Sequence, residues 1–232
     1  MKMPLIFKLI LISIICFVLA YVFYSLSGQD GMRFISPHRH EDKVTTSQTY
    51  RASFGHVKNV TIDTVDADLT LKQSDNDMGG ITFDADDALT SAISIRKTGD
   101  SITIQLVDKG AGHPESMIVT LPKSVRSVHA NTISGDIIVT YLKTPDYALE
   151  SVSGDIELKV DGADIGRIKV ATVSGDIKVS VKGKLAKKIF AEAENGDVDV
   201  DSELAAAVVN RAGTDGMTLS SVNGEIDIKS DH

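Results

Sequence analysis

Hydrophobic and polar residues alternate with a period of two along most of the chain beyond residue 57. In the segment IKVSV at 177–181, for example, Ile177, Val179 and Val181 alternate with polar residues. Successive side chains of a β-strand point to opposite faces, so this pattern predicts strands with one buried face and one solvated face. The apolar positions are mostly Val and Ile, which favour strands because they are β-branched. We therefore predict an all-β fold.

The alternating segments recur around a short turn motif. The segment TISGDIIV at 132–139 returns as SVSGDIEL, TVSGDIKV, AENGDVDV and SVNGEIDI, which begin at residues 151, 172, 193 and 221. The turn glycines are 19, 21, 21 and 28 residues apart, and a period near 20 is typical of stacked supersecondary units. The motif predicts structural turn glycines at Gly135, Gly154, Gly175, Gly196 and Gly224.

Each repeat is predicted to be a strand, a tight turn and a second strand. The turn chemistry also permits antiparallel hairpins, but residues that recur at one period are satisfied most simply when each repeat stacks in parallel on its predecessor. Such stacking gives a β-solenoid, a β-helix-like stack of two-stranded coils, with the main repeats in residues 125–230. We expect the turn glycines to supply the positive φ that such a corner requires.

Other segments extend the stack. Residues 60–73 match the repeat weakly, with Asp-Ala-Asp at the turn, and are predicted to form a degenerate first coil. Residues 92–106 are predicted to form a hairpin that turns around Gly99, and residues 116–122 a further strand. The stretch ELAAAVVNRAGTDG at 203–216 is interpreted as a loop, a short helix or an imperfect extra coil.

The N-terminal segment differs from the rest of the chain. Residues 9–26 carry no charge and are nearly all apolar, a length that reaches the lower limit for a membrane-spanning helix. A cleaved signal peptide is the alternative, because small residues near the end of the run suit a cleavage site. The chain is thus predicted to hold an N-terminal membrane anchor, or uncleaved signal, at 1–28, a polar linker at 29–56 and a β-strand-repeat domain at 57–232.

The charges before this segment predict its orientation. Lys2 and Lys8 favour a cytoplasmic N-terminus, so we expect a single-pass protein of the bacterial cytoplasmic membrane whose body is periplasmic or extracellular. The anchor and signal-peptide interpretations both place the body there. Cys16, the one cysteine, lies within the apolar run, so the folded body is predicted to have neither disulfide nor thiol chemistry.

Composition and missing motifs narrow the function. The formal net charge of −8 disfavours binding to nucleic acid, which requires a basic face. The sequence contains no G-x-S-x-G, H-E-x-x-H, P-loop or G-x-G-x-x-G motif, so we predict no enzyme activity, no catalytic residues and no cofactor. His38 and His40 are interpreted as linker residues and not as metal ligands, because solvated linkers seldom form preorganised sites.

One acidic residue follows each turn glycine. In a parallel stack these acids would form a column with neighbours about 5 Å apart. We interpret the column as part of the turn structure, with the acids held by neighbouring Ser and Asn side chains and by turn amides, and we predict no metal site. Binding of a divalent cation is the alternative, although one acid per repeat supplies few ligands. The column consists of Asp136, Asp155, Asp176, Asp197 and Glu225.

A group of lysines stands out against the acidic composition. We interpret the group as a solvated face, with contact to an anionic envelope polymer or partner as the alternative. Its members are Lys178, Lys182, Lys184, Lys187 and Lys188.

The repeats also carry a resemblance to a known family. The segment IVTLPKSVRSVHANTISGDIIV at 118–139, with the further SGD-I repeats and the N-terminal apolar segment, resembles the bacterial putative adhesins, a domain of unknown function with β-strand repeats. The resemblance covers about residues 44–230 and departs from the motif at Ala67, Glu194 and Glu225. It implies a β-helix-like fold and an exported, often membrane-tethered location, and it supplies no active site.

These observations together predict a non-enzymatic, membrane-tethered extracytoplasmic binding or scaffold module. Its expected contacts are the membrane, through residues 9–26, and an envelope protein or polysaccharide. Two alternatives stay open. In the first alternative, the chain is a self-assembling β-helical structural protein, since open solenoid ends can pair. In the second, it is a membrane-anchored accessory protein of envelope stress.

Overall fold

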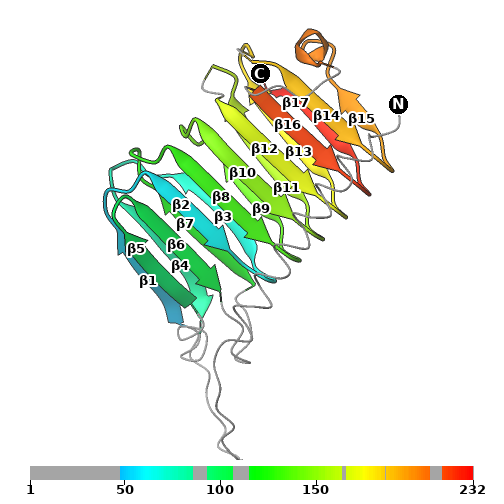
Figure 1. The fold of residues 1–232 in the computed structure, drawn as a ribbon. Helices are drawn as coiled ribbons and strands as arrows, with labels where there is room; N and C mark the ends of the chain where they lie inside the picture. Colours follow the sequence, from blue (N-terminus) through cyan, green and yellow to red (C-terminus); the bar gives the residue numbers. More distant parts are fainter. Residues whose placement is uncertain are drawn as a thin grey trace, which may run out of the picture. The chain divides into compact units, whose positions relative to one another are not determined.

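The computed structural model describes residues 48–85, 93–106, 115–163, 166–185, 187–209 and 216–231. Its strands form two sheets that lie face to face (Figure 1). Sheet A has nine strands, in the spatial order β1 (Gln48–Phe54), β4 (Gly79–Ala85), β7 (Ser116–Leu121), β3 (Asp68–Gln73), β9 (Ile137–Thr140), β11 (Ile156–Asp161), β13 (Ile177–Lys182), β17 (Ile226–Asp231) and β15 (Val198–Val200). Sheet B has eight strands, in the spatial order β14 (Ile189–Ala193), β16 (Gly216–Ser221), β12 (Arg167–Thr172), β10 (Asp146–Ser151), β8 (Ser127–Thr132), β2 (Asn59–Asp63), β6 (Ser101–Leu106) and β5 (Ile93–Thr98).

Each repeat contributes one strand to each sheet. Strand β10 of sheet B, for example, leads through the turn at Gly154 into β11 of sheet A. Equivalent strands of neighbouring coils pair in parallel and in register, so that Ile156 lies beside Ile137 on one side and Ile177 on the other. The predicted all-β stack of two-stranded parallel coils is therefore confirmed, and antiparallel hairpins are not the repeating unit.

The core lies between the two sheets and is continuous along the stack. It is built from the inward residues of both sheets, including the column of Ile137, Ile156, Ile177 and Ile226, each of which is 0% exposed. Full burial of each such side chain stabilises the fold by about 1.5–3 kcal/mol. The same position in the 193–200 repeat is held by Val198, which is 39% exposed. The core is thus closed in the middle of the stack and open at this end.

The spatial order of the coils differs from their order in the chain. We predicted that each coil would stack on its predecessor, but β16 and β17 pair with β12 and β13, and β14 and β15 lie outside them. The β16–β17 coil therefore occupies the slot between two coils that precede it in the sequence. The chain passes this slot between β13 and β14 and returns to it after β15. This arrangement explains the exposure of Val198.

A similar insertion occurs at the other end of the stack. The β2–β3 coil, predicted to be the first coil, pairs with β8 and β9, and the later strands β6 and β7 lie outside it. Strands β5 and β6 form the predicted hairpin around Gly99, and β7 forms the predicted strand. Residues 48–54 of the predicted linker instead form β1, which pairs antiparallel with β4.

Little of the described chain is helical. Part of the segment at 203–216 forms the short 3₁₀ turn η1 (Ala205–Ala207), which agrees with the loop or short-helix interpretation. No helix within the described residues has the length and apolar character needed to cross a membrane. The predicted anchor at 9–26 lies outside the described residues.

Candidate functional site

The five turn glycines are required because the adjacent coil leaves no room for a side chain at these positions. We predicted positive φ at these positions, but none of the five is among the glycines with positive φ. A Cβ atom at Gly175 would instead lie 2.2 Å from the carbonyl oxygen of Gly154 in the adjacent coil, and one at Gly154 would lie 2.1 Å from that of Gly135. The predicted backbone conformation was wrong, because the requirement arises from the close approach of stacked main chains.

Buried hydroxyl groups stabilise the same corners. The Oγ atom of Ser151 accepts the amide proton of Gly154 at 2.9 Å and donates to the carbonyl oxygen of Gly135 at 3.4 Å. Each such hydroxyl satisfies polar main-chain groups that would otherwise be buried without partners. The sequence contains the signal, a Ser or Thr three residues before the glycine, but we did not single it out. The buried members of this column are Thr132, Ser151, Thr172 and Ser221.

The predicted acid column forms a ladder of hydrogen bonds along the corner. The Oδ1 atom of Asp136 accepts the main-chain N–H of Asp155 at 2.8 Å, and Oδ1 of Asp155 accepts that of Asp176 at 2.8 Å. The ladder continues from Asp176 to Glu225 at 2.9 Å and starts one coil earlier than predicted, at Asp68. Each carboxylate thus binds the next coil through its main chain.

The predicted partners of these acids are confirmed in part. Turn amides do hold them, whereas the Asn195 side chain donates to the Asn223 side chain at 2.9 Å. Asp197 lies at the outer end, where its carbonyl oxygen accepts the N–H of Ile226. Within the described part of the chain, no group of three or more His, Cys, Asp or Glu residues is arranged to hold a metal ion.

Neutralising the middle of the ladder should have little effect on stability. The double substitution Asp155→Asn and Asp176→Asn keeps an oxygen acceptor for each amide and removes like-charge repulsion. We expect the free energy of unfolding to change by less than about 1 kcal/mol. Chemical denaturation of the two proteins measures this difference.

Calcium provides the control for this interpretation. Millimolar Ca²⁺ should raise the Tm of the wild-type protein by no more than NaCl of equal ionic strength, because screening alone acts on the column. A larger rise with Ca²⁺ that disappears in the double variant would assign the column to cation binding.

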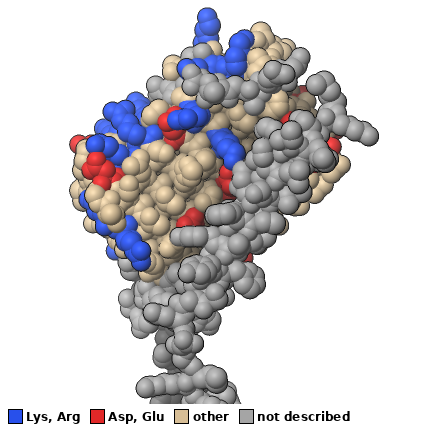
Figure 2. All heavy atoms as spheres, in the orientation of Figure 1, with Lys and Arg blue, Asp and Glu red and all other residues tan. Residues whose placement is uncertain are grey.

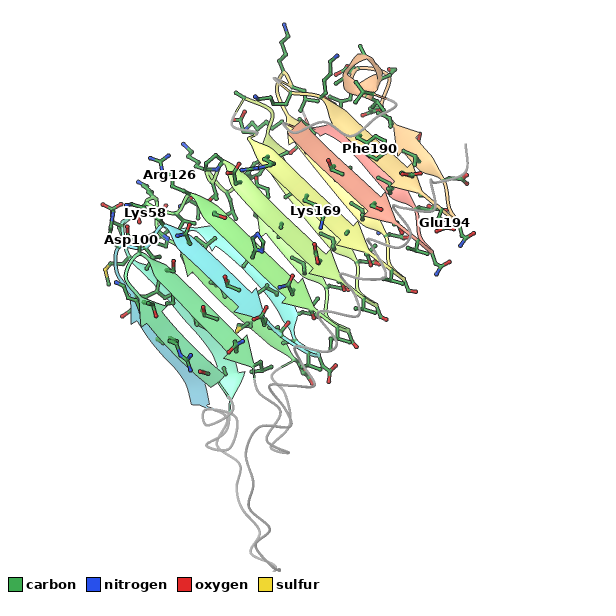
Figure 3. All side chains as sticks on the ribbon, viewed as in Figure 1. Lys58, Asp100, Arg126, Lys169, Phe190 and Glu194 are labelled. Carbon is green, nitrogen blue, oxygen red and sulfur yellow. The ribbon has the colours of Figure 1, made fainter. Side chains whose placement is uncertain are left out.

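The outer face of sheet B carries aligned polar side chains. The carboxylate of Asp63 accepts hydrogen bonds from Gln105 on one neighbouring strand and Asn131 on the other, at 3.2 and 2.9 Å. Farther along, Lys169 pairs with Glu150 at 2.6 Å, and Figure 3 shows Lys169 on this sheet. We define the sheet-B face by the outward polar residues of β2, β6 and β8, which are Asn59, Thr61, Asp63, Ser101, Thr103, Gln105, Ser127, His129 and Asn131.

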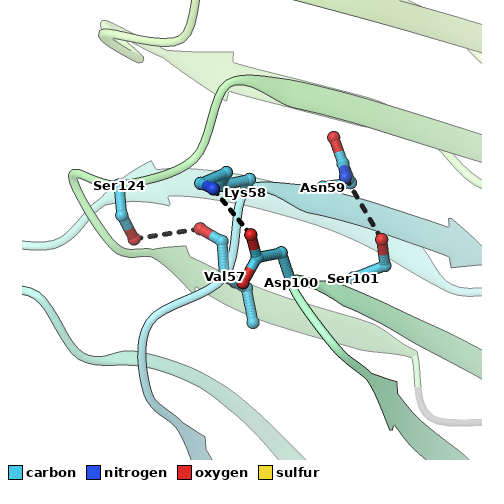
Figure 4. A network of polar contacts seen from close by, with 6 residues as sticks. All are labelled: Val57, Lys58, Asn59, Asp100, Ser101 and Ser124. Atoms are coloured by element: carbon cyan, nitrogen blue, oxygen red, sulfur yellow. Dashed lines mark hydrogen bonds and ion pairs between the residues drawn. The ribbon is translucent and has the colours of Figure 1, made fainter.

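A polar network holds one corner of this sheet (Figure 4). Lys58 pairs with Asp100 at 2.6 Å, and the hydroxyl of Ser124 donates to the carbonyl oxygen of Val57 at 2.9 Å. The hydrogen bond and charge of Lys58 hold the pKa of Asp100 below its usual value. Both charged side chains are about half exposed. Because solvent screens their attraction, the ion pair contributes little to the stability of the fold. The network is structural and sets the corner between β2, β6 and β8.

A tyrosine in an unusual conformation links several coils of sheet A. Tyr141 has a φ of 44°, which is uncommon for a bulky residue. Its hydroxyl hydrogen-bonds to the carboxylate of Asp231, and the ammonium of Lys182 lies 5.9 Å from the centre of its ring. The hydrogen bond to Asp231 raises the pKa of Tyr141 above its ordinary value of 10.0. These contacts with β17 and β13 hold Tyr141 in its strained backbone conformation.

Removing the Tyr141 hydroxyl should change stability in a pH-dependent way. The raised pKa means that folding favours the protonated phenol, so the contribution is present below pH 10 and is lost as the pH rises through the folded-state pKa. We expect Tyr141→Phe to have a lower Tm than the wild type at neutral pH, with the difference shrinking at strongly alkaline pH. Paired thermal melts across this range measure the difference, and a gap that widens with pH would contradict it.

The structure separates the predicted lysine group into two parts. Lys178 lies on the outer face of sheet A, beside Glu157 and Asp227 of the adjacent strands. The other four, Lys182, Lys184, Lys187 and Lys188, lie around one cavity. His129 is exposed on sheet B, and the linker histidines His38 and His40 lie outside the described residues.

Comparison with known proteins agrees with this architecture. Residues 57–231 match the family model described as Toastrack DUF4097. The structure of a putative cell adhesion protein from Clostridium sporogenes is similar, with a TM-score of 0.58 at 11% identity over 80% of this chain and 100% of that chain. A putative adhesin from Bacteroides fragilis has a TM-score of 0.41 at 12% identity over 81% and 99% of the two chains. No curated protein is significantly similar.

The family match settles what the repeats indicated. The matched region contains all five SGD-type repeats and the degenerate coil before them. The resemblance to the bacterial putative adhesins is thereby confirmed, and the first of the two structures shows the same fold. Because the family model covers most of its length, the chain belongs to the Toastrack DUF4097 family.

Proposed function

We propose that the chain is a non-enzymatic binding module that residues 9–26 tether to the cytoplasmic membrane, with its body outside the cytoplasm. The observation that carries the binding role is the sheet-B face, in which polar side chains of three neighbouring strands stand in register. The uncharged apolar run at 9–26 supports the tether.

The geometry of the sheet-B face favours an extended, hydroxyl-rich partner. Its columns repeat at about 4.8 Å, the spacing of paired strands, and present hydroxyl, amide and imidazole groups that donate and accept hydrogen bonds. Thr61 lies beside Thr103 and His129 in one such column. A polysaccharide of the cell envelope has complementary chemistry along its length, and an envelope protein is the other partner class. The name of the similar Clostridium sporogenes structure supports a role in adhesion.

Binding to isolated cell-wall polysaccharide tests the role of this face. The full chain in detergent should sediment with the polysaccharide, and Thr61→Glu with Thr103→Glu should abolish sedimentation by placing two charges on the face. Thr70→Glu with Ser180→Glu is the matched control, because these partly exposed residues lie on the outer side of sheet A. Equal losses in both variants, or no binding by the wild type, would reject the sheet-B face as the site.

Protease accessibility tests the location. In spheroplasts of the native host, added protease should digest the body of the full chain while a cytoplasmic control protein stays intact. A variant that lacks residues 1–28 should become resistant and should leave the membrane fraction. Resistance of the full chain in intact spheroplasts would place the body in the cytoplasm and reject the proposed topology.

One observation favours self-assembly as a second candidate function. Strand β15 pairs on one side only within the described residues, and Val198 on this strand is 39% exposed. Open edges of this kind can pair with another chain. Sedimentation of the full chain in detergent should give one mass at all concentrations for a binding module. A mass that grows with concentration, and that Val198→Lys returns to the smallest species, would favour assembly.

A further inference from the structure

A cavity lies where the loop after β13 meets the turn η1 and the end of β17. Its volume is about 780 Å³, within the range of 300–1,000 Å³ that is usual for small-molecule sites. Figure 1 shows η1 at the end of the stack that holds β14 and β15. The loop 183–188 and the return segment that contains η1 both exist because the β16–β17 coil is inserted, so the cavity is a product of the coil order.

The rim of the cavity is basic on a protein whose formal net charge is −8. Lys184 and Lys187 are exposed and make no ion pair within the described part of the chain. Lys188 donates to the carbonyl oxygen of Ala206 at 3.1 Å, which ties the loop to η1. Four ammonium groups line the cavity, against the two carboxylates of Glu203 and Asp231. The rim thus carries two more positive than negative side chains.

One of the two carboxylates, that of Asp231, is engaged with groups other than Lys184 and Lys187. Asp231 accepts the hydrogen bond from the Tyr141 hydroxyl, and Tyr141 in turn lies under the ammonium of Lys182. These contacts hold Asp231 and Lys182 together at one side of the cavity. Lys184 and Lys187, which make no ion pair among the described residues, are therefore a source of positive potential on the rim. Figure 2 shows basic side chains projecting from the end of the stack where this loop lies.

The inner wall of the cavity is apolar. Leu204 is 4% exposed and packs on the core, and Leu185, Ala206 and Ala207 also line the wall. A lining that combines apolar residues with several ammonium groups fits a ligand that has a compact anionic group and an uncharged organic part. Water can solvate the ammonium groups but makes no favourable contact with the apolar lining, whereas an organic anion can contact both.

We propose that this cavity binds a phosphate ester about as large as a glycerol phosphate or a sugar phosphate. Lysine ammonium groups bind phosphate as point charges, and a phosphate monoester carries nearly two negative charges at neutral pH, which suits two unpaired ammonium groups. A phosphodiester in a lipid headgroup has the same chemistry with one charge. This site is separate from the sheet-B face and does not depend on the proposed function of that face.

Two measurements on the full chain test the proposal, the first by isothermal titration calorimetry and the second by thermal melting. One arm uses the chain in phosphatidylcholine nanodiscs and adds glycerol 3-phosphate. The other compares nanodiscs made with and without phosphatidylglycerol and monitors the Tm of the body. We expect saturable binding in the first arm or a higher Tm with phosphatidylglycerol in the second, and salt should weaken either response. Lys184→Ala with Lys187→Ala should lower the affinity at least about tenfold in the first arm or remove the Tm rise in the second.

A matched variant separates the cavity from overall charge. Arg96→Ala with Lys97→Ala removes the same two positive charges from exposed positions on β5, in the hairpin at the other end of the stack. It should bind each probe as the wild type does. Binding in the first arm identifies a free phosphate ester, and a response in the second arm alone identifies the lipid headgroup. No response in either arm, or equal weakening in the two variants, would overturn the proposal.

Discussion

Replacing Ile226 by Ala should lower the free energy of unfolding by about 2–5 kcal/mol, the usual cost of truncating a fully buried aliphatic side chain. Ile226 is 0% exposed because the β16–β17 coil lies inside the stack, with β13 on one side and β15 on the other. The cavity left behind would be enclosed by neighbouring coils that cannot close without disturbing the register. Urea denaturation of the two proteins measures the loss.

Val198→Ala is the control, since Val198 holds the same position in its repeat. Its 39% exposure predicts a loss below about 1 kcal/mol. The comparison tests the order of the coils, because stacking in the order of the sequence would bury Val198 and leave Ile226 at the end. A larger loss for Val198→Ala than for Ile226→Ala would show that the coils follow the sequence.

Replacing Gly175 by Ala should be the most damaging of the small substitutions, with a loss of at least about 3 kcal/mol. The new Cβ atom would meet the carbonyl oxygen of Gly154 at 2.2 Å, and that oxygen belongs to the main chain of the adjacent coil. Relief requires the two coils to separate at the corner, which weakens the ladder hydrogen bonds beside it. The measurement is again the free energy of unfolding.

Gly55→Ala is the matched control for this substitution. Its Cβ atom would have Met78 Sδ as its nearest neighbour at 3.9 Å, an ordinary van der Waals distance. We expect this variant to stay within about 1 kcal/mol of the wild type. Equal stability of Gly175→Ala and Gly55→Ala would mean that the coils are farther apart at the corner than the structure shows.

The repeated elements of the fold could be predicted from the sequence, but the order of the coils could not. Alternation within the repeat identifies inward residues such as Ile156 and Leu158, and both are fully buried. Every repeat presents nearly the same inward column and the same ladder to its neighbours, so two repeats exchange places at little cost in pairing. The order depends on where the connections after β13 and after β15 lead, which the repeat pattern does not report.

At the corner that contains the turn glycines, the sequence likewise predicted some features and not others. The need for glycine at Gly175 was visible in the repeat, but its cause depends on the distance between two main chains, which no local pattern reports. The acid column was also visible, since one acid recurs at each turn. Its ladder of amide contacts between coils follows from the register, which sets Asp155 beside Asp176. The lysine cavity arises from the connections and could not be placed before the coil order was known.

The inserted coil also bears on how the chain reaches its native state during synthesis. Among the named strands of the described residues, β14 pairs with β16 and β15 with β17. As the chain leaves the ribosome, the β14–β15 segment therefore emerges before the strands that hold it have been made. The solenoid cannot grow one coil at a time from the N-terminus, as a sequential repeat protein can. Completion waits for β16 and β17, which enter an interior slot, and a nascent chain that lacks them leaves β14 and β15 without the strands on which they stack.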